Sequence, residues 1–251
     1  TAIFANSPFD QGKPSEYKSL RSHFWHYTDK DRTGITPFVF DKNFNFETYT
    51  DYALNVPMYF IKRDNKYIDM TGITFSQFLE GKKNENNILF EPEIKDWIDH
   101  LSTLFPQIRL KQYLEVRSMD ACSWNEVCAP AAFWTGIIYD NESLNATLDL
   151  MKDWTNEDRL LLNKSVPKHG LNTKFQNKNV LDIAKELLVI SETGLKRRNN
   201  LSTNKKYDET HYLLGLKENI SKGVSPADIL LEKYQKEWNE SIDPIYKELI
   251  F

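Results

Sequence analysis

The chain has 251 residues, of which 40% are hydrophobic and 27% charged, and this is the length and composition of an ordinary globular protein with a buried core. Its formal net charge of −4 argues against long-range attraction to nucleic acid, and no apolar run approaches the roughly 20 residues of a membrane span. The two cysteines are too few for a disulfide framework, which favours a reducing cytoplasm, and we expect no signal peptide.

The first 40 residues show little periodicity and are rich in polar and aromatic side chains, so we expect surface loops followed by a short strand at residues 35–40. Arg21 lies in this segment, with His23 and Trp25 close by. An arginine in a polar loop is most often only solvated. The neighbouring aromatic rings favour a guanidinium that is held in place to bind an anion, and His23 shares the same loop.

Residues 44–104 are predicted to form a series of short elements. The capping-box pattern T-F-S-Q, which begins at Thr74, predicts a short helix that Gly81 closes. The other predictions for this segment are a helix at 44–54, a hairpin of 58–62 and 66–69 with Asn65 in its turn, a surface loop at 82–87 and a helix at 93–104.

Residues 108–120 read I-R-L-K-Q-Y-L-E-V-R-S-M-D and alternate with a period of two, which predicts one strand whose apolar face is buried against a core. Glu115 and Arg117 lie two residues apart, so on a strand both side chains point into the same space. A solvated strand also carries charges on one face. This pair, however, offers a hard oxygen ligand for Mg²⁺ and a guanidinium fork for phosphate or carboxylate, as phosphoryl chemistry requires.

Helices are predicted from there to the end. The first is buried and spans 124–139, where Pro130 must kink or restart it. Basic residues 196–198 suit the negative end of a helix dipole better than a nucleic-acid patch. The remaining predictions are helices at 143–154, from Thr155 to about 165, at 179–198 and from Ser225 to about 238, and a short segment at 244–251 that docks on the core.

Common catalytic and binding motifs are missing from the sequence. It contains no glycine-rich phosphate loop, no H-E-x-x-H and no G-x-S-x-G. Cys122 and Cys128 lack the second pair that a zinc site needs, and a buried structural role is the commoner one for such thiols. The five histidines show no metal-ligand spacing, so we expect most of them at the surface or in helix caps.

The motif Y-L-E-V-R-S-M-D at residues 113–120 resembles the corresponding strand of glutamate–cysteine ligases. Agreement with the plant and alphaproteobacterial branch of that family extends over essentially the whole chain. The matching stretches include F-A-N-S-P-F at 4–9, R-S-H-F-W at 21–25, D-K-D-R-T-G at 29–34, D-Y-A-L-N-V-P-M-Y-F at 51–60, A-F-W-T-G-I-I-Y-D at 132–140 and S-I-D-P at 241–244.

This resemblance implies an ATP-dependent, ADP-forming ligase that joins the γ-carboxylate of glutamate to the amine of cysteine, the first step of glutathione biosynthesis. The γ-carboxylate is phosphorylated first, and the amine then displaces phosphate. The implied fold is α+β and similar to glutamine synthetase, with a curved, mostly antiparallel sheet and helices outside it. The implied cofactors are ATP and Mg²⁺, and neither nucleic acid nor a membrane is an expected partner.

The resemblance also implies roles for individual residues. Glu115 is expected to be a Mg²⁺ ligand, and Arg117 a catalytic residue that stabilises negative charge on the phosphoryl group and the tetrahedral intermediate. Trp25 and Tyr59 are equally compatible with packing. The residues expected to bind substrate are Arg21, as the clamp of glutamate, with His23, Trp25 and Tyr59.

Three departures from the family pattern restrict these expectations. Met70 and Glu85 replace the paired cysteines of redox-controlled plant members, so we expect no thiol switch, and S-M-D-A-C-S-W replaces G-A-D-G-G-P-W. Family members also carry a comparable stretch before this one, with most acidic metal ligands and much of the ATP site. We therefore expect a single domain at 1–251, the carboxy-terminal part of a longer catalytic domain, with a sheet and loop part at 1–120 and a helical part at 121–251.

Alone, such a part has one metal carboxylate where several are needed, so we expect little or no activity without the missing amino-terminal part. Two alternatives remain open. One is a related ligase that joins glutamate to a different amine. The other is a non-catalytic binding or assembly module that kept the glutamate pocket, although the presence of both Glu115 and Arg117 speaks against it.

Overall fold

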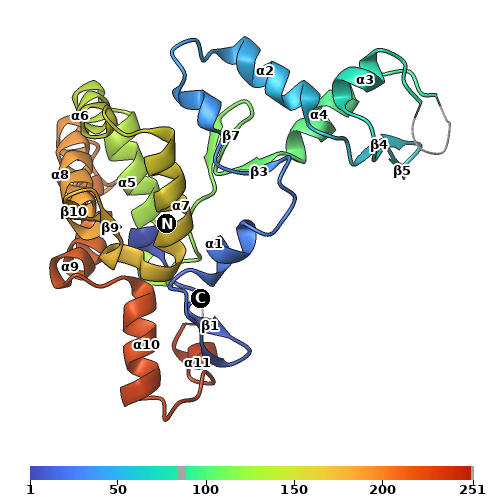
Figure 1. The fold of residues 1–251 in the computed structure, drawn as a ribbon. Coiled ribbons are helices and arrows are strands. Elements are labelled where there is room, and N and C mark those ends of the chain that lie inside the picture. Colours follow the sequence, from blue (N-terminus) through green and yellow to red (C-terminus); the bar gives the residue numbers. More distant parts are fainter. Residues whose placement is uncertain (84–88, 250–251) are drawn as a thin grey trace. The chain divides into compact units, whose positions relative to one another are not determined.

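The computed structural model describes residues 1–83 and 89–249 (Figure 1). Helices and two-stranded sheets alternate along the chain, which confirms the α+β class. Backbone contacts divide it into two compact units. We call residues 1–24 with 119–251 the helical unit, and residues 25–118 the hairpin unit. The predicted loop at 82–87 and the end of the predicted segment at 244–251 lie partly outside the described residues.

The helical unit contains most of the helices. α1 (Leu20–Trp25) begins in it, although a loop was expected there. Its other elements are the strand pairs β1 (Phe9–Asp10) with β2 (Lys13–Pro14) and β9 (Lys174–Phe175) with β10 (Lys178–Asn179), and the helices α5 (Ala129–Ile138), α6 (Asn141–Met151), α7 (Asn156–His169), α8 (Val180–Arg198), α9 (Leu214–Lys222), α10 (Pro226–Lys236) and α11 (Ile245–Glu248).

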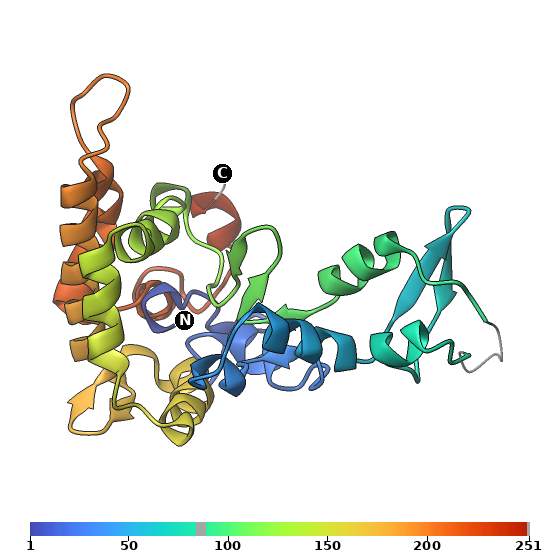
Figure 2. The same cartoon turned by 90° about the horizontal axis from the view of Figure 1, so that it is seen from above.

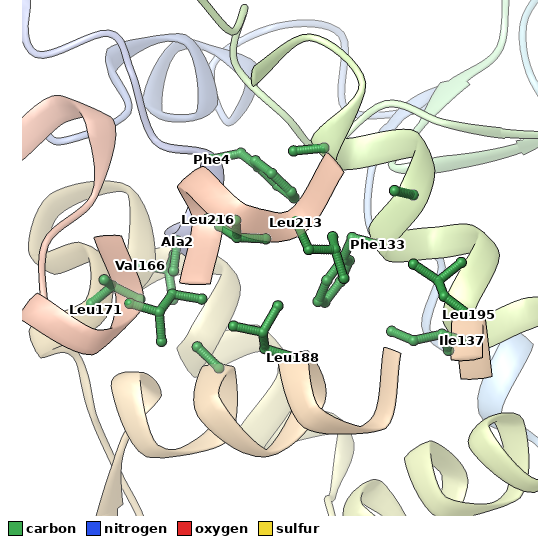
Figure 3. Packing of buried hydrophobic residues seen from close by; sticks show 14 residues of the cluster. Ala2, Phe4, Phe133, Ile137, Val166, Leu171, Leu188, Leu195, Leu213 and Leu216 are labelled. Carbon is green, nitrogen blue, oxygen red and sulfur yellow. The ribbon is translucent and has the colours of Figure 1, made fainter. Parts of the chain in front are cut away.

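Helices α5, α6 and α8 pack side by side (Figure 1), and α5 and α8 contribute most of the residues of the main core of this unit. Phe133 of α5 and Leu188 and Leu195 of α8 are buried there, together with residues of the first turn of the chain (Figure 3). Two glycines let α5 and α8 approach closely: a Cβ atom on Gly194 would lie only 1.9 Å from the backbone oxygen of Gly136. The apolar stripes of these helices therefore meet at unusually short range.

Several predictions for the helical unit are confirmed, and one helix starts later than expected. α7 and α10 begin with reciprocal capping boxes at Thr155 and Ser225, and the basic trio occupies the last turn of α8. The buried helix predicted from 124 starts at Ala129, with Pro130 in its first turn. Trp124 lies before it in an exposed 3₁₀ turn, because proline lacks the amide hydrogen that a continuous helix needs there.

The hairpin unit is built from short elements around two small cores. Figure 2 shows the hairpin of β4 and β5 as cyan arrows. The elements are the parallel pair β3 (Thr33–Gly34) with β6 (Phe105–Pro106), the 3₁₀ helix η2 (Pro37–Phe40), α2 (Phe46–Asn55), β4 (Phe60–Arg63) with β5 (Lys66–Asp69), α3 (Phe75–Leu79), α4 (Ile94–Ser102), and β7 (Ile108–Leu110) with β8 (Leu114–Val116).

Local signals predicted this unit well at two places. Asn65 lies in the β4–β5 turn with φ 61°, and Thr74 and Gln77 form the expected capping box of α3. The strand expected at 35–40 is wrong, because Pro37 starts a 3₁₀ turn there. Most histidines were expected at the surface or in helix caps, and His100 is an exception, because its Nε2 atom lies 2.8 Å from the Ala53 carbonyl in the interior.

The single strand predicted at 108–120 is wrong, since β7 and β8 form an antiparallel hairpin closed by residues 111–113. The predicted burial is also inverted. On the apolar face Ile108 is 40% and Leu114 59% exposed, whereas Arg109 on the charged face is 7% exposed. The alternation of apolar and charged residues continues through the turn. The sequence pattern of two short strands is therefore the same here as that of one long strand. Of the helices in the described residues, none is both long and apolar enough to cross a bilayer.

Candidate functional site

Glu115 and Arg117 share one side of the β7–β8 hairpin, as their spacing predicts. Nη1 of Arg117 donates to Oε1 of Glu115 at 2.9 Å. Glu115 lies on β8 and Arg117 follows directly, where its amide still pairs with the Gln107 carbonyl at 2.9 Å. The hairpin pairing therefore fixes both backbones, and the two side chains meet on the more buried face.

Arg109 is a third member of this cluster, and its role was not recognised in the sequence. It pairs with Glu115 in the hairpin register, and its Nε donates to Oε2 of Glu115 at 2.8 Å. Its Nη1 donates to the carbonyls of Ser102 and Leu104 at 2.7 and 3.0 Å. The spacing of six residues between Arg109 and Glu115 predicts a contact only if a hairpin turn lies between them, because the turn places the two residues opposite each other on paired strands.

The two arginines stabilise the charged form of the Glu115 carboxylate. Partial burial acts to raise the pKa of Glu115, but hydrogen bonds and charge from Arg109 and Arg117 outweigh it and hold that pKa below its ordinary value. The Glu115 side chain is 30% exposed, so the carboxylate stays reachable from solvent. It is therefore ionised at neutral pH, with Arg109 on Oε2, Arg117 on Oε1 and part of the side chain open to solvent.

Aromatic rings surround Arg117. Its guanidinium carbon lies 6.0 Å from the Trp25 ring and 5.3 Å from the Phe105 ring, and these two rings pack edge to face. Rings at this range attract a guanidinium and restrict its motion. The structure thus brings Trp25 to the Glu115–Arg117 pair. Trp25 contributes packing there, and its predicted contact with substrate stays a prediction.

Tyr59 belongs to a different cluster of the hairpin unit. Its hydroxyl donates to Oδ2 of Asp29 at 2.7 Å, and the Arg32 guanidinium lies 3.5 Å above its ring. Arg32 is 1% exposed and also donates from Nη2 to the Pro57 carbonyl at 2.6 Å. These contacts are those of a packed polar core, so the packing alternative describes the observed surroundings of Tyr59, and its role toward substrate stays a prediction.

Arg21 and His23 lie on α1 in the helical unit, and their surroundings are described separately. The Arg21 amide donates to Oγ of Ser7 at 3.2 Å, which fixes the backbone that carries its guanidinium. The His23 ring stacks on Tyr17 with centroids 3.7 Å apart. Both residues are partly buried rather than freely solvated. Their predicted contacts with glutamate stay predictions.

Asp120 anchors this part of the helical unit and was missed by sequence reasoning. Its Oδ2 accepts from the Asn6 amide at 2.8 Å and from Oγ of Ser7 at 2.7 Å, and its Oδ1 accepts from Oγ of Ser19 at 2.8 Å. Ser7 in turn accepts from the Arg21 amide. Asp120 thus ties the chain start to the first turn of α1 across more than a hundred residues, a separation that no local pattern reveals.

The remaining sequence candidates carry little chemistry. Burial raises the pKa of the Cys122 thiol to about 11, which disfavours a thiolate, and Cys128 is exposed and unpaired with it. Met70 is buried in an apolar core, while Glu85 lies outside the described residues. Within residues 1–83 and 89–249, histidines, cysteines and carboxylates form no group of three or more that can hold a metal.

Comparison with known proteins places this geometry in context. Residues 1–248 match the family described as glutamate–cysteine ligase family 2. The chain is 49% identical over its whole length to "Glutamate--cysteine ligase A, chloroplastic" of Oryza sativa subsp. indica, covering 49% of that protein. It is also 49% identical, again over its whole length, to "Glutamate--cysteine ligase, chloroplastic" of Arabidopsis thaliana, covering 47% of that protein.

Two facts follow from these relatives. The chain spans about half the length of the curated relatives that it matches, with 46% coverage of the Solanum lycopersicum protein as a further case. The expected cytoplasmic location is contradicted, because these relatives are named as chloroplastic. A low cysteine count reports a reducing environment, and it does not distinguish one reducing compartment from another.

Proposed function

Because the chain belongs to glutamate–cysteine ligase family 2, we propose that it is part of an ATP-dependent ligase that joins the γ-carboxylate of glutamate to the amine of cysteine. The chain covers about half of its relatives, so this activity belongs to the longer protein. On its own, the chain is proposed to have little or no activity. The relatives' names point to a plastid as its location.

The observation that carries the proposal is the Glu115–Arg117 pair, with its hydrogen bond of 2.9 Å on the charged face of the hairpin. In the proposed reaction, the γ-carboxylate oxygen attacks the terminal phosphate of ATP, ADP leaves, and the amine then displaces phosphate from the acyl phosphate. Arg117 stabilises negative charge on the phosphoryl oxygens and on the tetrahedral intermediate. A pair that only packed would not require a solvent-accessible carboxylate beside a held guanidinium.

Glu115 is suited to one position in a magnesium site. Its Oε1 accepts a hydrogen bond from Arg117, and a carboxylate oxygen has a second lone pair that can bind a further partner. Mg²⁺ in phosphoryl-transfer sites commonly takes one or two carboxylates and fills its other positions with water and phosphate oxygens. When bound, the ion lowers the charge repulsion at the transferring phosphate. Any further protein ligands are proposed to come from the part that this chain does not span.

Substrate binding is assigned by the same proposal. Arg21 clamps the carboxylate of glutamate, since a guanidinium fork matches that group, and His23 lies on the same helix. Trp25 and Tyr59 are each proposed to contact substrate through the aromatic ring. A fold similar to glutamine synthetase, with a curved antiparallel sheet, is proposed for the whole protein, and the antiparallel β7–β8 pair would be part of it.

The test is phosphate release by this chain joined to the amino-terminal part of a close relative, with ATP, Mg²⁺, glutamate and a panel of amines. Cysteine is expected to give the highest kcat/KM of the panel. A different preferred amine would assign the chain to a related glutamate ligase. Phosphate release from no amine, with the joined protein folded by circular dichroism, would indicate a binding module and contradict the proposal.

A further inference from the structure

The side chain of Arg109 is fully committed to groups of its own unit. Nε and Nη2 both lie against Oε2 of Glu115, at 2.8 and 2.5 Å, and Nη1 donates to two backbone carbonyls. The carbonyls belong to Ser102 at the end of α4 and to Leu104 just after it. Its exposed fraction is 7%. Each nitrogen of this guanidinium therefore already has an oxygen partner within the hairpin unit, which favours a structural role over direct contact with substrate.

These contacts make the two oxygens of Glu115 unequal. Oε2 accepts a hydrogen bond from Nε of Arg109 and also lies 2.5 Å from its Nη2, whereas Oε1 accepts from Nη1 of Arg117. A carboxylate can rotate about its last bond, and one bond to Arg117 alone would not stop this rotation. The double contact on Oε2 stops it, because Arg109 is itself fixed to the backbone. The orientation of Oε1 is therefore fixed, and so is the position of the Arg117 guanidinium that donates to it.

We propose that Arg109 is a positioning residue of the site, which fixes the orientation of the Glu115 carboxylate and thereby sets the position of Arg117 on Oε1. The inference rests on the proposed function, because the proposed function assigns the catalytic chemistry to Glu115 and Arg117. It adds a residue that never touches substrate and links the site to the end of α4. Outer partners of metal-ligating carboxylates act in this way, and their loss typically lowers metal affinity 10- to 100-fold.

The hairpin unit supplies a matched comparison for a purely structural role. Arg63 pairs with Asp96 through Nη1 to Oδ1 at 2.6 Å and Nη2 to Oδ2 at 2.8 Å, and its Nη2 also donates to the Glu91 carbonyl. This is also an arginine–carboxylate pair with a backbone anchor, although the Arg63 side chain is only partly buried. The Arg63 pair does not contain Glu115 or Arg117. Arg63→Lys therefore reports what the loss of such a pair does to folding alone.

The first test uses this chain by itself and needs no activity. Nitrogen-15 NMR measures the rotation rate of the Arg117 guanidinium in the wild type, Arg109→Lys and Arg63→Lys. A lysine presents one ammonium and cannot hold Oε2 and two carbonyls together. Arg117 is expected to rotate at least about fivefold faster in Arg109→Lys, and at the wild-type rate in Arg63→Lys. An unchanged rate in folded Arg109→Lys would overturn the proposal.

The second test measures the Mg²⁺ concentration for half-maximal phosphate release by the joined protein. About a tenfold higher requirement is expected for Arg109→Lys, with Arg63→Lys like the wild type. An active Arg109→Lys protein with a normal Mg²⁺ requirement would overturn the positioning role while the proposed function stands. If every version is inactive although folded, the proposed function fails, and the NMR result alone decides whether Arg109 positions the pair. Should Arg109→Lys not fold, Arg109→Gln is measured in its place.

Discussion

Nη1 of Arg117 donates to Oε1 of Glu115 at 2.9 Å, and the two residues are separated in the sequence only by Val116. Neighbours two apart on a strand point to the same side, and here they meet in an ion pair on the more buried face of a short hairpin. The pair therefore depends on the β7–β8 pairing, on Arg109 and on the aromatic rings around Arg117. Predictions about the protein follow from these and similar contacts.

Gly194→Ala is expected to destabilise the helical unit by about 2–3 kcal/mol, the upper range for overpacking. The new Cβ would lie 1.9 Å from the backbone oxygen of Gly136, so α5 and α8 would have to move apart. Urea unfolding followed by circular dichroism measures the change. The control is Gly215→Ala on α9, whose Cβ would meet Glu126 at an ordinary 3.5 Å and leave stability unchanged or slightly higher. Equal stability of the two variants would contradict the close packing.

Asp120→Asn is expected to cost about 1–3 kcal/mol, the usual penalty for an unmatched buried donor or acceptor. An amide group cannot accept on both sides, so either the Asn6 amide and Ser7 or the Ser19 hydroxyl can no longer donate to residue 120, and the local hydrogen bonds must rearrange. Hydrogen exchange should become faster at the amides of Asn6 and Arg21. Asp149→Asn, at an exposed site, should change neither stability nor exchange. Unchanged protection of both amides in Asp120→Asn would show that Asp120 is not the anchor.

His100 should make the stability of the hairpin unit depend on pH. Burial lowers the pKa of His100 below its ordinary 6.5, against the opposing hydrogen bond to the Ala53 carbonyl. The unfolded chain then binds more protons than the folded one as the pH falls below 6.5, so the stability contribution is complete above this pH and is lost below it. Urea midpoints at several pH values should fall less steeply in acid for His100→Gln. Identical slopes for the variant and the wild type would contradict this assignment.

Sequence reasoning succeeded where the signal is local. The capping boxes at Thr74, Thr155 and Ser225 depend on residues three apart, and the restart of a helix at Pro130 depends on one missing amide hydrogen. In the same way, the common direction of Glu115 and Arg117 follows from their spacing alone. These features are set by backbone geometry over one turn or one strand, which the sequence states directly.

The predictions that failed, and the residues that were missed, have a different cause. They depend on contacts with residues far away in the sequence or on turns that no residue type marks. Residues 111–113 close the β7–β8 hairpin without glycine, proline or asparagine, so nothing marks the turn. The buried guanidinium of Arg109 donates to two backbone carbonyls. Every residue has a backbone carbonyl, so the residue types at these positions do not reveal that they accept from Arg109. Asp120 meets its partners only after the chain folds back. Sequence reasoning therefore recognised Glu115 and Arg117, and it missed Arg109 and Asp120.

The most direct test of the central claim is ATP-, Mg²⁺- and glutamate-dependent phosphate release by the joined protein, with and without Arg117→Ala. Loss of a charge-stabilising donor costs about 10²–10³ in kcat for comparable sites. We expect a drop of at least about a hundredfold for Arg117→Ala, with Arg63→Lys close to the wild type and the chain alone inactive. Wild-type rates from folded Arg117→Ala would contradict the claim that the Glu115–Arg117 pair carries the chemistry.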